Sequence, residues 1–223
     1  MSTGQRKRLG ILISGRGSNM AALLQAAKEP SFPAQATLVL SNRADAAGLS
    51  YAAGEGVQTA VVDHKPFGRD REAFERAMDA RLRAAGVELI CLAGFMRLLT
   101  PWFVKQWRDR MLNIHPSLLP AFKGLHTHER ALETGVRLHG CTVHFVRAEM
   151  DDGPIIAQAA VPVLPGDDPD ALAARVLKAE HRLYPLALGL VASGQAKAEN
   201  EHVVFDPPET ACKALVLALD AEA

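Results

Sequence analysis

The stretch "LGILISGRGSNMAALLQAAK" (residues 9–28) predicts a strand, a tight glycine loop and a helix in direct succession. Its apolar run "LGILIS" (9–14) stops at Ser14-Gly15, and an alanine-rich segment of helical length follows from Asn19 to Lys28. A strand that turns straight into a helix is the first half of a β-α unit. The rest of the chain shows whether this unit is repeated.

The same alternation continues through the first half of the chain. Further strands are predicted over 36–41, 57–62, 88–94 and 111–115, and further helices over 45–53 and 69–85. In the last of these helices, Phe74, Met78 and Leu82 recur every four residues, while Arg and Glu occupy the opposite positions. One face of this helix therefore packs on a sheet. The pattern is typical of β-α units around a mainly parallel sheet.

The second half has a different pattern. "CTVHFV" (141–146) and "PIIAQAAVPV" (154–163) are separated only by a short acidic stretch, which predicts an antiparallel, hairpin-like element. A long helix is predicted from Asp170 to Leu183, and Pro185 is expected to kink or end it. We expect a single domain over residues 1–223, with a core from about 9 to 205 and an uncertain tail beyond it.

The composition limits the kinds of partner. Lys plus Arg total 25 and Asp plus Glu total 25, so no global field attracts nucleic acid or an anionic membrane. We expect small-molecule substrates, and either a monomer or a homodimer. Cys91, Cys141 and Cys212 lie far apart without a C-x-x-C motif, which favours reduced thiols in a cytoplasmic protein. No apolar run is long enough for a membrane span, which needs about 18 residues.

The glycine loop predicts a binding site for an anion. In "ISGRGSN" (13–19), the backbone N–H groups of Gly17, Ser18 and Asn19 lie at a helix N-terminus. Met20 replaces the third glycine of the dinucleotide fingerprint and the Walker lysine is missing, so NAD and ATP are disfavoured. A phosphate monoester is the better candidate. The alternative is an ordinary glycine turn with Ser18 or Asn19 as N-cap.

A second polar motif interrupts the apolar run "LNIHPSLLP" (112–120). Strand alternation puts Asn113 and His115 on one face, and Pro116 ends the strand where α/β sheets bind ligands. An amide that stabilises an oxyanion and a histidine that donates a proton suit acyl transfer. No G-x-S-x-G nucleophile motif is present, which favours direct attack by a substrate amine. The alternative is a hydrogen-bonded core pair.

Carboxylates in "EMDDGP" (149–154) would hold a nearby histidine in its protonated form. The sequence does not establish that they lie near His115. Taken alone, the stretch is more typical of a solvated acidic turn between two strands.

Several motifs together resemble the folate-dependent formyltransferase family, and in particular the phosphoribosylglycinamide formyltransferases, also called glycinamide ribonucleotide transformylases. They are "ISGRGSN", "AGFMRLLTP", "LNIHPSLLPAFKGLHTH", "HGCTVHFV", "MDDGPII" and "KAEHRLYP", in matching order and spacing over about residues 9–190. The resemblance implies a doubly wound α/β formyltransferase fold with helices on both faces of the sheet. It also implies transfer of the formyl group of 10-formyltetrahydrofolate to the amine of glycinamide ribonucleotide in purine biosynthesis.

The resemblance assigns catalytic roles by position. It implies that Asn113 polarises the formyl oxygen, His115 donates a proton, and Asp151 keeps the histidine protonated and helps to move protons through water. Asp152 stands where a small residue is common in the family, and its charge beside Asp151 predicts mutual repulsion. Arg16 would add positive charge to the phosphate site of the glycine loop.

The resemblance also implies binding residues. Folate contacts are expected at Arg71, which would meet the glutamate tail, at the segment Met96, Arg97, Leu98 and Leu99, and at Asn113. Without the resemblance, "GFMRLL" is typical of a buried apolar loop. Glu180 lies at the edge of the apolar stripe of the long helix, where the family places an acidic residue against the amine or ribose of the substrate. The alternative is a solvated glutamate.

No metal is expected. His126 and His128 form an H-x-H motif without a third ligand at convincing spacing, and His139 and His144 flank a predicted strand as structural residues.

Three other functions remain open. One is a 10-formyltetrahydrofolate hydrolase, which usually carries an N-terminal regulatory domain, whereas the first strand here is expected near residue 9. Another is a transfer RNA formyltransferase, which has an additional C-terminal domain. The third is a catalytically silent folate or phosphate binding protein.

Overall fold

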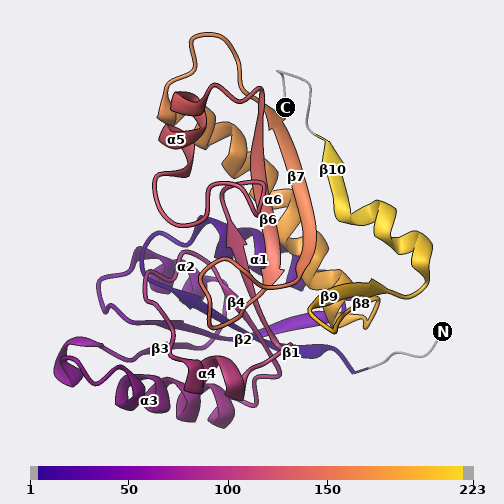
Figure 1. The fold of residues 1–223 in the computed structure, drawn as a ribbon. Helices are drawn as coiled ribbons and strands as arrows, with labels where there is room; N and C mark the ends of the chain where they lie inside the picture. Colours follow the sequence, from indigo (N-terminus) through magenta and orange to yellow (C-terminus); the bar gives the residue numbers. More distant parts are fainter. Residues whose placement is uncertain (1–4, 218–223) are drawn as a thin grey trace. The chain divides into compact units, whose positions relative to one another are not determined.

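The computed structural model describes residues 5–217, and Figure 1 labels most of its helices and strands. The chain divides into two compact units, one up to Asn113 and one from Ile114. Each unit is described by itself below. The expectation of one domain over residues 1–223 stays a prediction.

The first unit is built from parallel β-α units. Its elements are β1 (Lys7–Ile13), α1 (Ser18–Lys28), β2 (Ala34–Ser41), α2 (Ala47–Gly54), β3 (Thr59–Val61), η1 (Lys65–Phe67), α3 (Arg71–Ala84), β4 (Leu89–Leu92), α4 (Pro101–Gln106) and the start of β5 (Met111–His115). The strands pair in the order β3-β2-β1-β4-β5, and every pairing is parallel. The β-α pattern predicted for the first half is therefore confirmed.

The second unit contains the antiparallel element. After the end of β5 come α5 (Thr127–Thr134), β6 (Leu138–Phe145), β7 (Ile155–Pro162), α6 (Pro169–Ala192), β8 (Ala196–Glu199), β9 (His202–Phe205), η2 (Pro208–Ala214) and β10 (Leu215–Leu217). β6 and β7 pair antiparallel, α6 packs on both, and β10 pairs parallel to β7. β8 and β9 form a separate antiparallel sheet. The expected α/β fold, mostly parallel with an antiparallel element in the C-terminal half, is confirmed.

Local chemistry determines where the long helices begin. The Asp70 carboxylate accepts a hydrogen bond from the Ala73 N–H at 2.9 Å and so caps α3. In α6, Asp168 accepts from the Ala171 N–H at 2.8 Å in the same way. The predicted stripe of α3, formed by Phe74, Met78 and Leu82, is buried as expected.

α6 differs from the sequence prediction at Pro185. The helix continues through this proline to Ala192, so the expectation that Pro185 ends it near Leu183 is wrong. A proline removes one backbone hydrogen bond, but the helix face stays buried on both sides of it, at Tyr184 and Leu188. Burial of apolar surface outweighs the local propensity here. No helix within residues 5–217 is both long and apolar enough to cross a membrane.

The segment beyond residue 205 is structured as far as the description reaches. η2 precedes β10, which adds a parallel strand to β7 with Val216 opposite Ala159. The sequence left the order of this tail open; the structure describes it up to Leu217, and residues 218–223 lie outside the described part.

Gly140 gives a test of the β6–β7 pairing. A Cβ at this position would stand 1.9 Å from the carbonyl oxygen of Ala159, which is backbone and cannot rotate away. We expect Gly140→Ala to lower the free energy of unfolding by about 1–3 kcal/mol or more, measured by urea denaturation. Gly54→Ala, at the end of α2 with nothing within 4 Å of its Cβ, is the control and should be neutral or slightly stabilising. Equal urea midpoints for the two variants would contradict this account of the pairing.

Candidate functional site

The loop between β1 and α1 has the geometry of a helix N-terminus open to an anion. Gly17 is the N-cap, with φ 74° in the left-handed region, and α1 begins at Ser18. The alternative with Ser18 or Asn19 as N-cap is therefore wrong. The first N–H groups of a helix have no partner inside the helix, so those of this turn suit the oxygen atoms of a phosphate. Which ligand binds at Gly17, Ser18 and Asn19 stays a prediction.

The segment after β4 presents apolar side chains from a fixed backbone. The side chains of Met96 and Leu98 are 68% and 65% exposed, which excludes a buried apolar loop at these two positions. The Met96 N–H donates to Ser14 Oγ at 2.8 Å, and a guanidinium N–H of Arg71 donates to the Leu98 carbonyl at 3.1 Å. Arg71 and Met96–Leu99, predicted separately as folate contacts, are thus brought together within the first unit.

Further polar contacts support this segment from behind. The Ser14 hydroxyl donates to Asn42 Oδ1 at 2.6 Å, and the Asn42 amide lies 3.2 Å from His64 Nδ1. On the other side, the carboxylate of Glu75 in α3 accepts from the Thr100 N–H at 2.7 Å and also from the Thr100 hydroxyl. These bonds fix both ends of the segment Met96–Leu99.

Glu75 is a buried acid whose carboxyl group has a shifted pKa. It is 1% exposed, and burial raises the pKa of its carboxyl, although the hydrogen bonds from Thr100 act in the opposite direction. No sequence motif marks this residue, because it occupies an ordinary helical position between Phe74 and Met78.

Glu75→Gln should therefore change how stability depends on pH. Below the ordinary carboxyl pKa of 4.5, wild type and variant are both neutral at this position, so their stability difference is constant. As the pH rises through the raised pKa of Glu75, the wild type must ionise a buried group and loses stability relative to the variant. Urea unfolding of both proteins from about pH 4 to 8 measures the difference. A difference that does not vary with pH would contradict the raised pKa.

The end of β5 holds the two central residues of the predicted catalytic site. Asn113 lies opposite Leu92 in the first unit, and His115 is the last residue of the strand. The His115 side chain is 7% exposed, its Nδ1 lies 3.4 Å from Asp151 Oδ2, and its Nε2 lies 3.0 Å from the Phe122 carbonyl oxygen. Both ring nitrogens thus face oxygen atoms that can accept hydrogen bonds.

Asp151 lies between three polar groups of the second unit. Its Oδ2 accepts from the Gly124 N–H at 2.9 Å as well as facing His115, and its Oδ1 is 3.9 Å from His144 Nε2. The Asp151 side chain is only 10% exposed. For this residue, the alternative of a solvated acidic turn is therefore wrong.

Asp152 has a different environment from its neighbour. Its side chain is 54% exposed and forms an ion pair with the Lys123 ammonium group. The repulsion predicted between Asp151 and Asp152 is thus opposed by the Lys123 cation, which no sequence motif marks.

Glu180 lies in α6 and is buried, 6% exposed, so the alternative of a solvated edge glutamate is wrong. The nearby Cys141 thiol has a raised pKa, first because of burial and second because of the charge of Glu180. Glu180 is therefore an interior carboxylate of the second unit, and its contact with a substrate stays a prediction.

Two of the remaining histidines of the second unit are buried. His139 and His144 lie within β6, at 1% and 2% exposure. The His139 ring packs edge-on to His128, with centroids 5.3 Å apart, and burial lowers the pKa of His139 to about 4. Within residues 5–217, no group of three or more His, Cys, Asp or Glu side chains is arranged to hold a metal. His126, the other member of the H-x-H motif, faces Glu129 instead.

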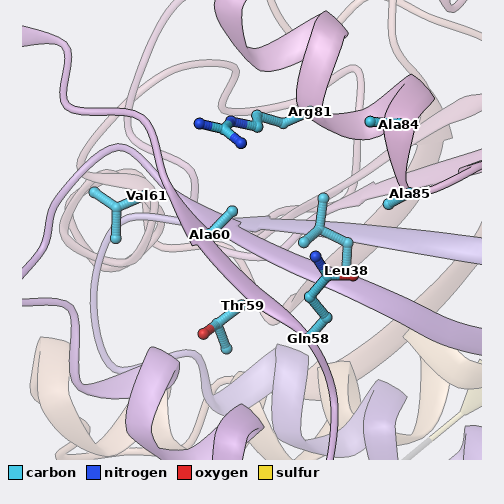
Figure 2. A pocket seen from close by; sticks show the side chains of 8 residues that line it. All are labelled: Leu38, Gln58, Thr59, Ala60, Val61, Arg81, Ala84 and Ala85. Atoms are coloured by element: carbon cyan, nitrogen blue, oxygen red, sulfur yellow. The ribbon is translucent and has the colours of Figure 1, made fainter.

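A separate cavity of about 300 Å³ lies in the first unit, between the edge of the sheet and the C-terminal end of α3 (Figure 2). Its lining residues are Leu38, Gln58, Thr59, Ala60, Val61, Arg81, Ala84 and Ala85. None of the predicted site residues is among them, so this cavity is no part of the predicted catalytic site.

Comparison with known proteins agrees with the arrangement of these motifs. A model of the family described as "Formyl transferase" matches residues 7–188. Over 190 residues, the chain is 50% identical to the human trifunctional purine biosynthetic protein adenosine-3. This match covers 85% of the chain, which spans only 19% of that longer protein.

Two bacterial relatives are matched along nearly their whole length. The chain is 43% identical to the phosphoribosylglycinamide formyltransferase of Escherichia coli, with 89% of this chain and 95% of that protein covered. Among solved structures, glycinamide ribonucleotide transformylase 1 from Symbiobacterium toebii is 48% identical, with a TM-score of 0.87. That likeness covers 91% of this chain and 95% of the other.

Proposed function

Because the chain belongs to the formyl transferase family, we propose that it transfers the formyl group of 10-formyltetrahydrofolate to the amine of glycinamide ribonucleotide. The products are formylglycinamide ribonucleotide and tetrahydrofolate, in a step of de novo purine biosynthesis. The observation that carries the proposal is the buried contact between His115 and Asp151. His115 lies two residues beyond Asn113 along β5. The bacterial relatives, whose names state this activity, support it.

In the proposed reaction, the substrate amine attacks the formyl carbon and a new C–N bond forms as the carbonyl oxygen becomes an oxyanion. The Asn113 amide and an N–H of His115 stabilise that oxyanion, and Asp151 keeps the histidine protonated. The bond from the formyl carbon to N10 of the folate then breaks. The proton lost by the attacking amine reaches N10, and Asp151 assists this transfer through water. The nucleophile is the substrate itself, so the chemistry needs no metal.

The binding roles follow the geometry of the first unit. The N–H groups at Gly17, Ser18 and Asn19 hold the phosphate of the ribonucleotide. The exposed side chains of Met96 and Leu98, together with Arg97 and Leu99, receive the folate ring system. Arg71 uses one N–H on the Leu98 carbonyl and offers its remaining donors to the glutamate tail.

Glu180 of the second unit contacts the amine or ribose of the ribonucleotide. The substrates are small molecules, and the site of action is the cytoplasm.

The direct test follows formyl loss from 10-formyltetrahydrofolate by absorbance, with and without glycinamide ribonucleotide. Loss that depends on the ribonucleotide, with formylglycinamide ribonucleotide as product, is expected. Loss without the ribonucleotide would identify a hydrolase instead. No loss under either condition would reject the proposed transfer and leave a binding protein.

Replacement of the two β5 side chains should separate catalysis from binding. Asn113→Ala and His115→Ala should each lower kcat by about 10²- to 10³-fold, because each removes one preorganised donor to the oxyanion. Ribonucleotide affinity, measured by calorimetry, should stay close to the wild-type value. His202→Ala, at an exposed position of β9, is the matched control and should leave kcat unchanged. Turnover at the wild-type rate in either β5 variant would reject the assignment.

A further inference from the structure

Three consecutive residues of the loop between β5 and α5 contact the catalytic pair or its neighbour. The Phe122 carbonyl faces His115 Nε2 at 3.0 Å, the Lys123 ammonium pairs with Asp152, and the Gly124 N–H donates to Asp151 at 2.9 Å. The backbone contacts on either side hold His115 and Asp151 directly. Of these three contacts, only the Lys123–Asp152 ion pair joins two side chains.

The backbone here is not in a relaxed conformation. Phe122 and Asp151 have φ 54°, and Gly124 has φ 82°, all in the left-handed region. For a residue other than glycine this conformation is strained, so the surrounding contacts must hold it. Arg130 of α5 holds the loop from the other side, donating to the Lys123 carbonyl at 2.7 Å. Lys123 is thus held through its carbonyl by α5 and through its side chain by Asp152.

We propose that Lys123 and Asp152 are a positioning pair for His115 and Asp151. Their ion pair holds the loop Phe122–Gly124 against the turn that carries Asp151, and so keeps the Gly124 N–H and the Phe122 carbonyl at hydrogen-bonding distance. It also neutralises the Asp152 charge beside Asp151. The structural part of this inference stands on its own, and its catalytic part rests on the proposed formyl transfer.

The expected effects are moderate. The Lys123 and Asp152 side chains are 37% and 54% exposed, and an exposed ion pair contributes about 1.5- to 5-fold to an equilibrium. Lys123→Gln and Asp152→Asn should each lower kcat by about this factor, and the double variant should lose no more than one single variant. Exchanging the charges, with Lys123→Asp and Asp152→Lys together, should restore most of the loss.

Hydrogen exchange at the Gly124 amide tests the positioning without any need for turnover. Exchange should become about 1.5- to 5-fold faster in each single variant and return toward wild type in the charge-exchanged protein. Lys7→Gln, which removes a similarly exposed ion pair with Glu88 in the first unit, is the matched control and should change neither exchange nor kcat. Added salt should shrink the difference between wild type and the single variants, because it screens exposed charges.

The outcomes separate the two proposals. Unchanged Gly124 exchange in both single variants, or faster exchange with unchanged kcat, would overturn the positioning role. A loss of kcat that the charge exchange does not restore would also overturn it. A third result would support the structural part and reject the proposed function. Hydrogen exchange at Gly124 would be faster in the single variants and return toward wild type when the two charges are swapped, but the wild-type protein would transfer no formyl group.

Discussion

The 3.4 Å contact between His115 and Asp151 is the constraint on which the rest of the candidate site depends. It requires that the turn after β6 return to the end of β5, and the local chemistry of that turn makes the return possible. Gly153 passes so close to Phe145 that a Cβ would stand 1.7 Å from the Phe145 carbonyl oxygen. Asp151 accepts a left-handed backbone conformation in the same turn. The tight turn therefore holds the Asp151 carboxylate in place without help from a substrate.

Burial strengthens the attraction between His115 and Asp151. The His115 and Asp151 side chains are at most 10% exposed, so salt and water screen their attraction much less than they screen a surface pair. A second histidine, His144, also lies beside Asp151, with its Nε2 3.9 Å from Asp151 Oδ1. Burial lowers the pKa of His144 and favours its neutral form, although the Phe145 carbonyl, 3.0 Å from its Nδ1, acts in the opposite direction. Asp151 Oδ2 thus faces His115 and accepts a hydrogen bond from the Gly124 N–H.

Periodic patterns predicted much of the fold because they report burial directly. The stripe of α3 and the spacing of Asn113 and His115 on one strand depend only on residues close in sequence. The approach of Asp151 to His115 was outside the reach of the sequence, since it depends on the register of β6 against β7 and on a left-handed turn. Pro185 shows the opposite failure: a strong local rule was overruled by packing of the helix face around it.

The supports of the site were the hardest features to predict. Ser14 and Met96 are 82 residues apart in the chain, and their hydrogen bond exists only because β1 and β4 are neighbours. Glu75 and Thr100 look unremarkable in sequence, yet their contacts hold the segment Met96–Leu99 in place. The family resemblance supplied the residues expected to meet substrates, whereas the structure supplied the groups that hold them.

A double-mutant cycle on His115 and Asp151 tests the central claim most directly. The kcat for formyl transfer is measured in wild type, His115→Ala, Asp151→Asn and the protein with both changes. If Asp151 acts chiefly through His115, removing it after His115 has been lost should cost only its share in proton transfer through water, so the loss in the double variant should be much smaller than the product of the two single losses. Two independent losses that multiply in the double variant would show that Asp151 works apart from His115, and would contradict this account.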